Sequence, residues 1–219
     1  MATSPHQDQP TRSVLLLGAT GLVGGECLRL LLDGPSFHRV TTLSRRPPGI
    51  THPKLEAIVL DFERLFTDPP PFAYDAVVCA LGTTIKQAGS RERFRRVDFE
   101  YPLAVARLAL DRGARHFLLV SSLGANARSR IFYSRVKGEL EDAVLALDYP
   151  AITIVRPSWL VGERDEIRIG EEIAKRLAFL VPRKYRPVPV RAVATALVEA
   201  AHAGPVGRKI VESGELHGH

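Results

Sequence analysis

Short apolar runs recur along the chain and alternate with segments whose apolar residues follow helical spacing. The first run, SVLLLGA at 13–19, is rich in leucine and valine and stops at a glycine, which is typical of a strand buried on both faces. Such runs predict strands at 13–19, 39–45, 55–61, 75–82, 116–122, 151–157 and 207–213, with helices at 24–34, 93–113, 135–147 and 190–203. This alternation predicts an α/β fold, a doubly wound parallel sheet flanked by helices.

The pattern also predicts how the chain is organised. We expect one folded domain over 13–214, preceded by a disordered tail at 1–12 that has no apolar segment. The least regular region is 158–189, which has prolines at 182, 187 and 189. We expect this region to be a small C-terminal excursion on the substrate side of the sheet.

Four glycines lie where the first strand should end and the first helix begin: Gly18, Gly21, Gly24 and Gly25. In a dinucleotide site the first glycine of such a series allows a tight turn, the second lets the backbone approach a pyrophosphate, and the third permits close helix packing. The helix N-terminus then offers unpaired amides to the phosphates. Because the glycines follow a predicted strand and open a predicted helix, they indicate a dinucleotide-binding loop rather than an ordinary turn.

The residues after the second predicted strand indicate which dinucleotide the chain binds. An NAD-specific site has an acidic residue there, whereas this chain has Ser44, Arg45 and Arg46. Guanidinium groups suit a 2′-phosphate, so we expect NADP(H), with a solvated basic turn as the alternative. Asp61, at the end of the third strand, is placed either to contact the adenine or to cap a surface turn.

A second group of polar residues follows the fifth predicted strand. Tyr133 and Lys137 are one helical turn apart, and Ser122 lies at the carboxyl end of the strand, where open α/β sheets bind their ligands. Tyr133 could act as a general acid toward a carbonyl oxygen, with its pKa lowered by the charge of Lys137. Ser122 could polarise the substrate oxygen, and Ser121 remains an alternative for that role.

Composition and charge limit the partners and the cellular location that we expect. The net charge of +6 is spread over scattered basic residues without a nucleic-acid-binding motif, so we expect no nucleic acid partner. No apolar run approaches the ~20 residues of a membrane span, no secretory signal is visible, and the histidines show no metal-ligand spacing. Cys27 and Cys79 lie in apolar segments and are expected to be reduced core thiols, which favours a cytoplasmic location.

Over nearly its full length the chain resembles the short-chain dehydrogenase/reductase superfamily. The segments GATGLVGG, SRR, CALGTTIKQAGSRERFRRVDFEY, LLVSSLGA, YSRVKGELE and VRPSWLVG carry the resemblance. It is strongest to the atypical branch with a small C-terminal part, which includes the Tat-interacting-protein-like NAD(P)-binding oxidoreductases.

The resemblance implies a Rossmann fold that binds NADPH. The implied cofactor contacts are Gly18, Thr20, Gly21, Leu22, Val23, Arg45, Arg46, Leu81, Gly82, Thr83, Lys137 and the backbone around Pro157. The expected activity is reduction of a small carbonyl substrate by hydride transfer, with Ser122, Tyr133 and Lys137 as the catalytic set and a homodimer as a plausible assembly. The alternatives are an NADPH-binding regulatory or interaction protein with little turnover and, disfavoured by the short C-terminal part, a sugar-nucleotide epimerase.

Overall fold

The computed structural model describes residues 12–161 and 182–218. Within these residues, seven strands form one parallel sheet with the order β3-β2-β1-β4-β5-β6-β9. The strands are β1 (Ser13–Leu17), β2 (Arg39–Ser44), β3 (Leu55–Val59), β4 (Ala76–Cys79), β5 (His116–Val120), β6 (Ala151–Arg156) and β9 (Gly207–Glu212). The predicted doubly wound parallel sheet is confirmed, because the chain moves outward from β1 in one direction and returns to continue from β4 in the other.

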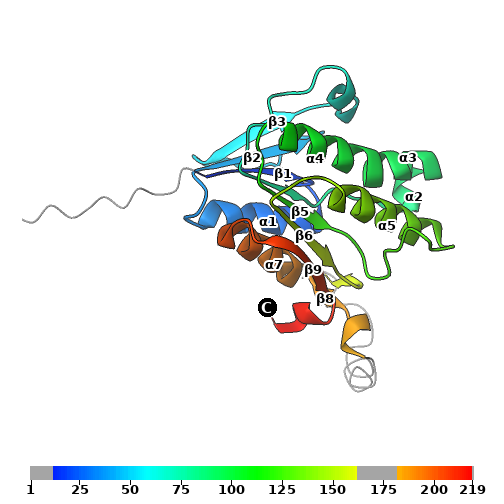
Figure 1. The fold of residues 1–219 in the computed structure, drawn as a ribbon. Helices are drawn as coiled ribbons and strands as arrows, with labels where there is room; N and C mark the ends of the chain where they lie inside the picture. Colours follow the sequence, from blue (N-terminus) through cyan, green and yellow to red (C-terminus); the bar gives the residue numbers. More distant parts are fainter. Residues whose placement is uncertain (1–11, 162–181, 219) are drawn as a thin grey trace, which may run out of the picture.

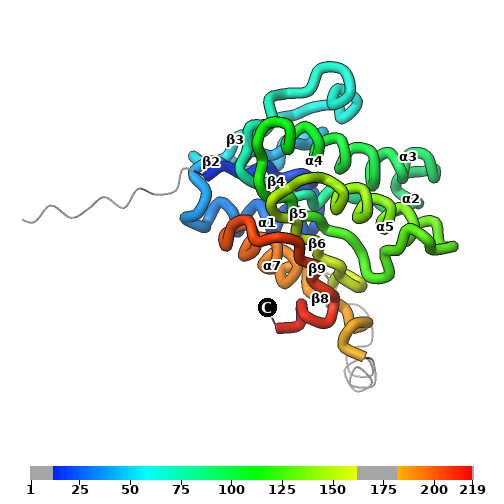
Figure 2. The backbone as a smooth tube through the Cα atoms, viewed as in Figure 1, coloured from blue at the N-terminus to red at the C-terminus, as the bar shows by residue number. Residues whose placement is uncertain are grey.

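Helices cover both faces of this sheet (Figure 1). One face carries α1 (Leu22–Asp33) and α7 (Val190–Ala203), which pack side by side. The other face carries α4 (Tyr101–Asp111) and α5 (Phe132–Leu145), and α2 (Ile85–Ala88) and α3 (Arg91–Arg95) lie at the end of this layer. The tube view in Figure 2 shows the same three layers.

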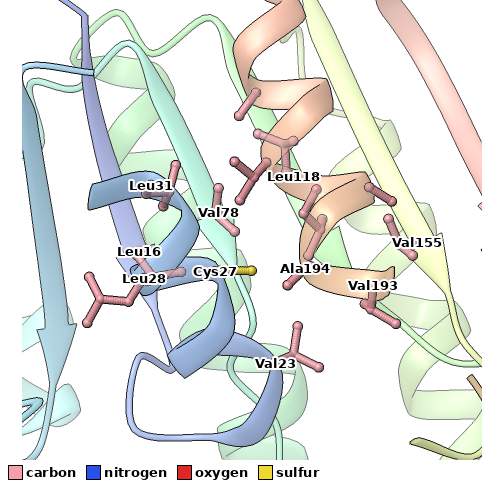
Figure 3. Packing of buried hydrophobic residues seen from close by; sticks show 14 of the residues in the cluster. Leu16, Val23, Cys27, Leu28, Leu31, Val78, Leu118, Val155, Val193 and Ala194 are labelled. Atoms are coloured by element: carbon pink, nitrogen blue, oxygen red, sulfur yellow. The ribbon is translucent and has the colours of Figure 1, made fainter. Parts of the chain in front are cut away.

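The apolar residues of the strands are divided between two cores, one under each helix layer. Figure 3 shows the core between the sheet and helices α1 and α7, in which the Cys27 side chain points from α1 toward α7. Leu16 and Leu31 are fully buried in this core, and each such side chain contributes about 2 kcal/mol of hydrophobic transfer free energy. Both cysteines are free and buried, as expected for core thiols.

The helix boundaries differ from the predicted ones where they matter most for the site. The first helix begins at Leu22 and not at 24, since Gly21 serves as its N-cap. The helix predicted at 135–147 begins at Phe132, so Tyr133 and Lys137 lie in one continuous helix. The helix predicted at 93–113 is α3 and α4 joined by a π-helical turn, Arg96–Glu100, which helical spacing alone does not reveal.

The expected tail at 1–12 and the expected excursion at 158–189 lie largely outside the described residues. Of the latter, the described ends form a two-stranded parallel sheet from β7 (Leu160–Val161) and β8 (Val188–Pro189), and Val188 joins the core under α7. None of the described helices combines the length and the apolar character needed to cross a membrane.

Candidate cofactor groove and active site

A groove of about 720 Å³ lies at the carboxyl ends of β1, β2 and β4. This is the point at which the strand order reverses, where open α/β sheets bind their ligands. Most of the residues predicted to contact the cofactor line this groove together: Gly18, Thr20, Gly21, Arg45, Arg46, Asp61, Leu81, Gly82 and Thr83. Leu22, Val23, Lys137 and Pro157 do not form its walls.

The glycine loop lines the groove, and side chains are sterically excluded at two of its glycines. Gly18 has a φ of +82°, and a Cβ at this position would lie 2.4 Å from the carbonyl oxygen of Ala80, directly after β4. A Cβ at Gly24 would lie 2.0 Å from the carbonyl oxygen of Gly18. The first helical turn of α1 is therefore packed directly on the loop backbone, as the third glycine of a dinucleotide loop allows.

This packing leaves the N-terminus of α1 open toward the groove. The first helical hydrogen bond runs from the amide of Gly25 to the carbonyl of Gly21 at 2.8 Å, so the amides of the preceding turn have no helical acceptor. Such amides and the helix dipole bind phosphate. The Leu22 side chain is 64% exposed and that of Val23 is in the core, so a contact from either residue would come from its backbone.

Arg45 and Arg46 line the groove directly after β2. Ser44 is buried, and its hydroxyl donates a 2.5 Å hydrogen bond to the carbonyl of Arg46, which fixes the turn. Both guanidinium groups are exposed, and neither forms a side-chain hydrogen bond or an ion pair with another described residue. Two uncompensated cations thus face the groove.

Asp61 also lines the groove, but its carboxylate accepts a 3.1 Å hydrogen bond from the amide of Glu63 and caps the 3-10 helix Phe62–Phe66. The structure therefore shows the capping alternative that we considered for Asp61. The adenine contact remains a prediction.

A charged wall of the groove was not predicted from the sequence. Glu63 receives hydrogen bonds from the Nε of Arg96 at 3.0 Å and from the hydroxyl of Tyr101 at 2.6 Å, and Arg96 is also paired with Glu100. The bonds from Arg96 and then Tyr101 lower the pKa of Glu63 to about 2. The helical spacing of Arg93, Arg96 and Glu100 on one predicted helix was the available signal, but their partner Glu63 comes from another element.

The ammonium of Lys137 lies next to Gly82, which lines the groove. Its Nζ lies 3.6 Å from the position that a Cβ on Gly82 would occupy. It also lies 2.8 Å from Oδ1 of Asp98, and the side chains of Lys137 and Asp98 are 6% and 0% exposed. The structure thus places Lys137 next to the loop after β4 that lines the groove.

Tyr133 is held one turn before Lys137 by aromatic packing. Its ring lies 5.5 Å from that of Phe94 on α3, which in turn lies 5.8 Å from Phe132. Tyr133 is close enough to raise the pKa of Lys137 through its charge. The structure therefore brings the two predicted residues together on one face of α5.

The two candidate serines differ in their surroundings. The hydroxyl of Ser121 is buried and has no hydrogen-bond partner among the described residues. The hydroxyl of Ser122 is half-buried and donates to the carbonyl of Leu123 at 3.2 Å. Leu123 in turn donates its amide to the carbonyl of Pro157 at 2.8 Å, which joins the segments that follow β5 and β6. Alternation along β5 directs the Ser121 side chain to the face covered by α5, since Phe117 and Leu119 pack there.

The sheet topology, the glycine loop and the groove define a Rossmann-type dinucleotide-binding protein. Comparison with known proteins agrees: residues 18–204 match the family described as NAD(P)H-binding, and the chain belongs to that family. The protein HTATIP2 of Rattus norvegicus is 36% identical over 194 residues, which cover 85% of this chain and 80% of that protein. This likeness supports the atypical short-chain dehydrogenase/reductase branch inferred from the motifs.

Fungal relatives correct one expectation. The protein FMP52-1, mitochondrial, of Scheffersomyces stipitis is 38% identical over 160 residues, which cover 70% of this chain and 69% of that protein. The expectation of a cytoplasmic location is wrong on this comparison, because this and several other fungal relatives are named as mitochondrial proteins. A missing secretory signal and reduced cysteines do not distinguish the cytoplasm from an organelle that also keeps thiols reduced.

Solved structures show the fold at low sequence identity. Bordetella bronchiseptica WbmH in complex with NAD+ has a TM-score of 0.68 at 17% identity, and the match covers 93% of this chain and 75% of that one. MoeE5 in complex with UDP-glucose and NAD has a TM-score of 0.66 at 15% identity, with 93% and 79% covered.

Proposed function

We propose that this protein is an NADPH-dependent oxidoreductase that reduces a small carbonyl compound. The observation that carries the proposal is the position of Lys137: a buried ammonium under the Gly82 edge of the groove, one helical turn from Tyr133. A tyrosine beside a fixed cation at the end of a dinucleotide groove is suited to proton transfer.

The residues of the groove fit the cofactor. The amides at the start of α1 would bind the pyrophosphate, and Arg45 and Arg46 would bind a 2′-phosphate. When bound, the dihydronicotinamide would supply a hydride to the carbonyl carbon of the substrate. Two exposed cations and no acid after β2 favour NADP(H) over NAD(H).

The side chains next to the groove would transfer a proton to the substrate's carbonyl oxygen. Tyr133 would donate its hydroxyl proton to the carbonyl oxygen as the carbon accepts the hydride, so that an alcohol and a tyrosinate form. The Lys137 ammonium would stabilise that tyrosinate and hold the nicotinamide ribose. A serine hydroxyl would donate a hydrogen bond to the same oxygen, and Ser121 suits this role because its hydroxyl is unpartnered and faces α5.

Substitution of Tyr133 by Phe tests the proposal, because it removes the proton and keeps the ring packing on Phe94. We expect kcat for reduction of a panel of aldehydes and ketones to fall by about 10² to 10⁴-fold, with an unchanged Kd for NADPH. Tyr74→Phe is the matched control, since Tyr74 is buried before β4 at the opposite end of the sheet.

Two results would contradict the reductase mechanism. One is equal turnover by the parent protein and the Tyr133→Phe variant. The other is tight NADPH binding by the parent without reduction of any carbonyl in the panel, which would support a regulatory or interaction protein instead.

A further inference from the structure

Asp98 is a buried acid to which the sequence analysis assigned no role. Its side chain is fully buried, and it lies in the π-helical turn between α3 and α4. Burial of an ionised carboxylate is strongly unfavourable unless the group is paired and hydrogen-bonded. The buried carboxylate of Asp98 therefore needs partners that compensate the cost of its burial.

The π-helical turn explains how Asp98 comes to face the site. Phe94 on α3 is buried against the rings of Phe132 and Tyr133 on α5, and Leu103 on α4 is buried in the core under this helix layer. Asp98 lies between Phe94 and Leu103 along the chain. The additional residue in a π turn keeps Asp98 on the buried side between these two positions. Single π turns inside α-helices are often found at functional sites.

Both carboxylate oxygens of Asp98 have a partner in the site. Oδ1 lies 2.8 Å from the Nζ of Lys137, and Oδ2 accepts a 2.9 Å hydrogen bond from the amide of Thr83. Thr83 lines the groove, and a Cβ on Gly82 would lie 3.3 Å from Oδ1. One carboxylate thus joins the ammonium on α5 to the loop that follows β4.

The ion pair determines whether Lys137 can carry its charge. Burial works to lower the pKa of Lys137, but the charge of Asp98 and then that of Tyr133 outweigh burial, and the net direction is upward. Cys79 on β4 faces the ammonium as well and acts in the same direction with a smaller effect. Burial raises the pKa of Asp98, against the opposing effects of Lys137 and the Thr83 amide.

We propose that Asp98 is a positioning residue of this site: its carboxylate keeps the buried Lys137 ammonium charged and ties it to the Thr83 backbone in the groove. The assignment rests on the proposed function for the role of Lys137 toward Tyr133 and the cofactor. The pairing itself is a property of the protein without cofactor, so it can be tested separately.

The geometry requires a carboxylate at this position. An amide has one acceptor oxygen and a donor NH₂ group. In an Asp98→Asn variant the oxygen could accept from Lys137 or from Thr83, and the NH₂ group would face the other donor. The substitution keeps the size of the side chain and removes the charge, so it isolates the electrostatic role.

The direct test is the titration of Lys137 in the cofactor-free protein. The chain has only six lysines, so their ¹³Cε-labelled NMR signals can be resolved, and the signal missing in Lys137→Met identifies Lys137. We expect the titration midpoint of Lys137 to fall by about one pH unit or more in Asp98→Asn. The matched control is Asp142→Asn, which removes an exposed carboxylate from the same helix and should leave the midpoint unchanged.

A second readout connects the pair to the groove. In Asp98→Asn we expect the Kd for NADPH to rise about tenfold and the pH profile of kcat to shift, because both depend on the Lys137 charge. An unchanged Lys137 midpoint in Asp98→Asn overturns the inference, even where the parent reduces carbonyls. A parent protein that binds no NADPH would refute the proposed function, and a shifted Lys137 midpoint would still support the role of Asp98.

A double variant decides the matter if Asp98→Asn does not fold. In Asp98→Asn/Lys137→Met the uncompensated charge is removed together with its partner. Recovery of folding in the double variant supports the inference that Asp98 serves Lys137. Failure of the double variant to fold overturns it, because the carboxylate would then be needed by the fold itself.

Discussion

Gly24 and Gly25 offer a matched pair of substitutions for testing the dinucleotide loop. Both are in the first turns of α1, and replacement by Ala at either position gains up to about 1 kcal/mol of helix propensity. Their surroundings differ sharply. A Cβ at Gly25 would lie 3.5 Å from the carbonyl oxygen of Ala19, an ordinary contact, whereas a Cβ at Gly24 would lie 2.0 Å from the carbonyl oxygen of Gly18.

The expected loss of stability in Gly24→Ala follows from these distances. Restoring an ordinary contact at Gly24 requires α1 and the loop backbone to separate by more than about 1 Å, and overpacking on this scale costs about 1–3 kcal/mol or more. We therefore expect Gly24→Ala to be about 2–4 kcal/mol less stable than Gly25→Ala, since both share the propensity gain. A displaced loop also loses its phosphate hydrogen bonds, so the Kd for NADPH should rise by roughly 100-fold.

Urea denaturation followed by circular dichroism measures the stability difference, and quenching or enhancement of NADPH fluorescence measures the affinity. Gly25→Ala should match or exceed the parent in stability and bind NADPH with a similar Kd. Equal stability and equal affinity of the two variants would refute the reasoning, because the steric conflict at Gly24 is the only difference assigned to them.

Two further predictions concern the groove and the opposite end of the sheet. The double variant Arg45→Gln/Arg46→Gln should weaken NADPH binding about 10- to 100-fold and leave NADH binding unchanged, since charge-assisted hydrogen bonds to a 2′-phosphate are lost. Arg107→Gln, an exposed position on α4, is the control, and an equal loss for both coenzymes would contradict our interpretation of the basic turn. His116 is buried 2.9 Å from the hydroxyl of Thr153, and burial, with a smaller effect of the Arg12 charge, lowers its pKa to about 4. Because the folded state then binds fewer protons than the unfolded state, stability is complete above about pH 6.5 and falls by up to about 3 kcal/mol toward pH 4. Thermal denaturation across this range should show a smaller loss in His116→Gln, and an identical loss would contradict the assignment to His116.

The order of the elements could be predicted from the sequence because local patterns encode it. Doubly buried strands are continuous apolar runs, and α1 and α7 show one apolar face each, so the pattern of strands and helices was visible without a structure. The glycine loop and the Tyr133–Lys137 spacing are local as well. The family resemblance follows from the same segments.

Other features depend on contacts between distant parts of the chain. The pairing of Asp98 with Lys137 and that of Arg96 with Glu63 each join residues from separate elements. The π-helical turn that contains Asp98 is continuous in the chain, but helical spacing does not reveal it. The sequence does not show which of the two neighbouring serines faces the site. The alternation of side chains along β5 and the packing of its two faces distinguish Ser121 from Ser122.

The sequence by itself therefore determined that a parallel sheet forms and that a dinucleotide loop precedes the first helix. Both features depend on the spacing of apolar residues and glycines within short segments. The tertiary structure decided which charges meet in the interior. A buried ion pair is stable only where both partners arrive at one place with their hydrogen bonds satisfied, and that condition is met across elements rather than along the sequence.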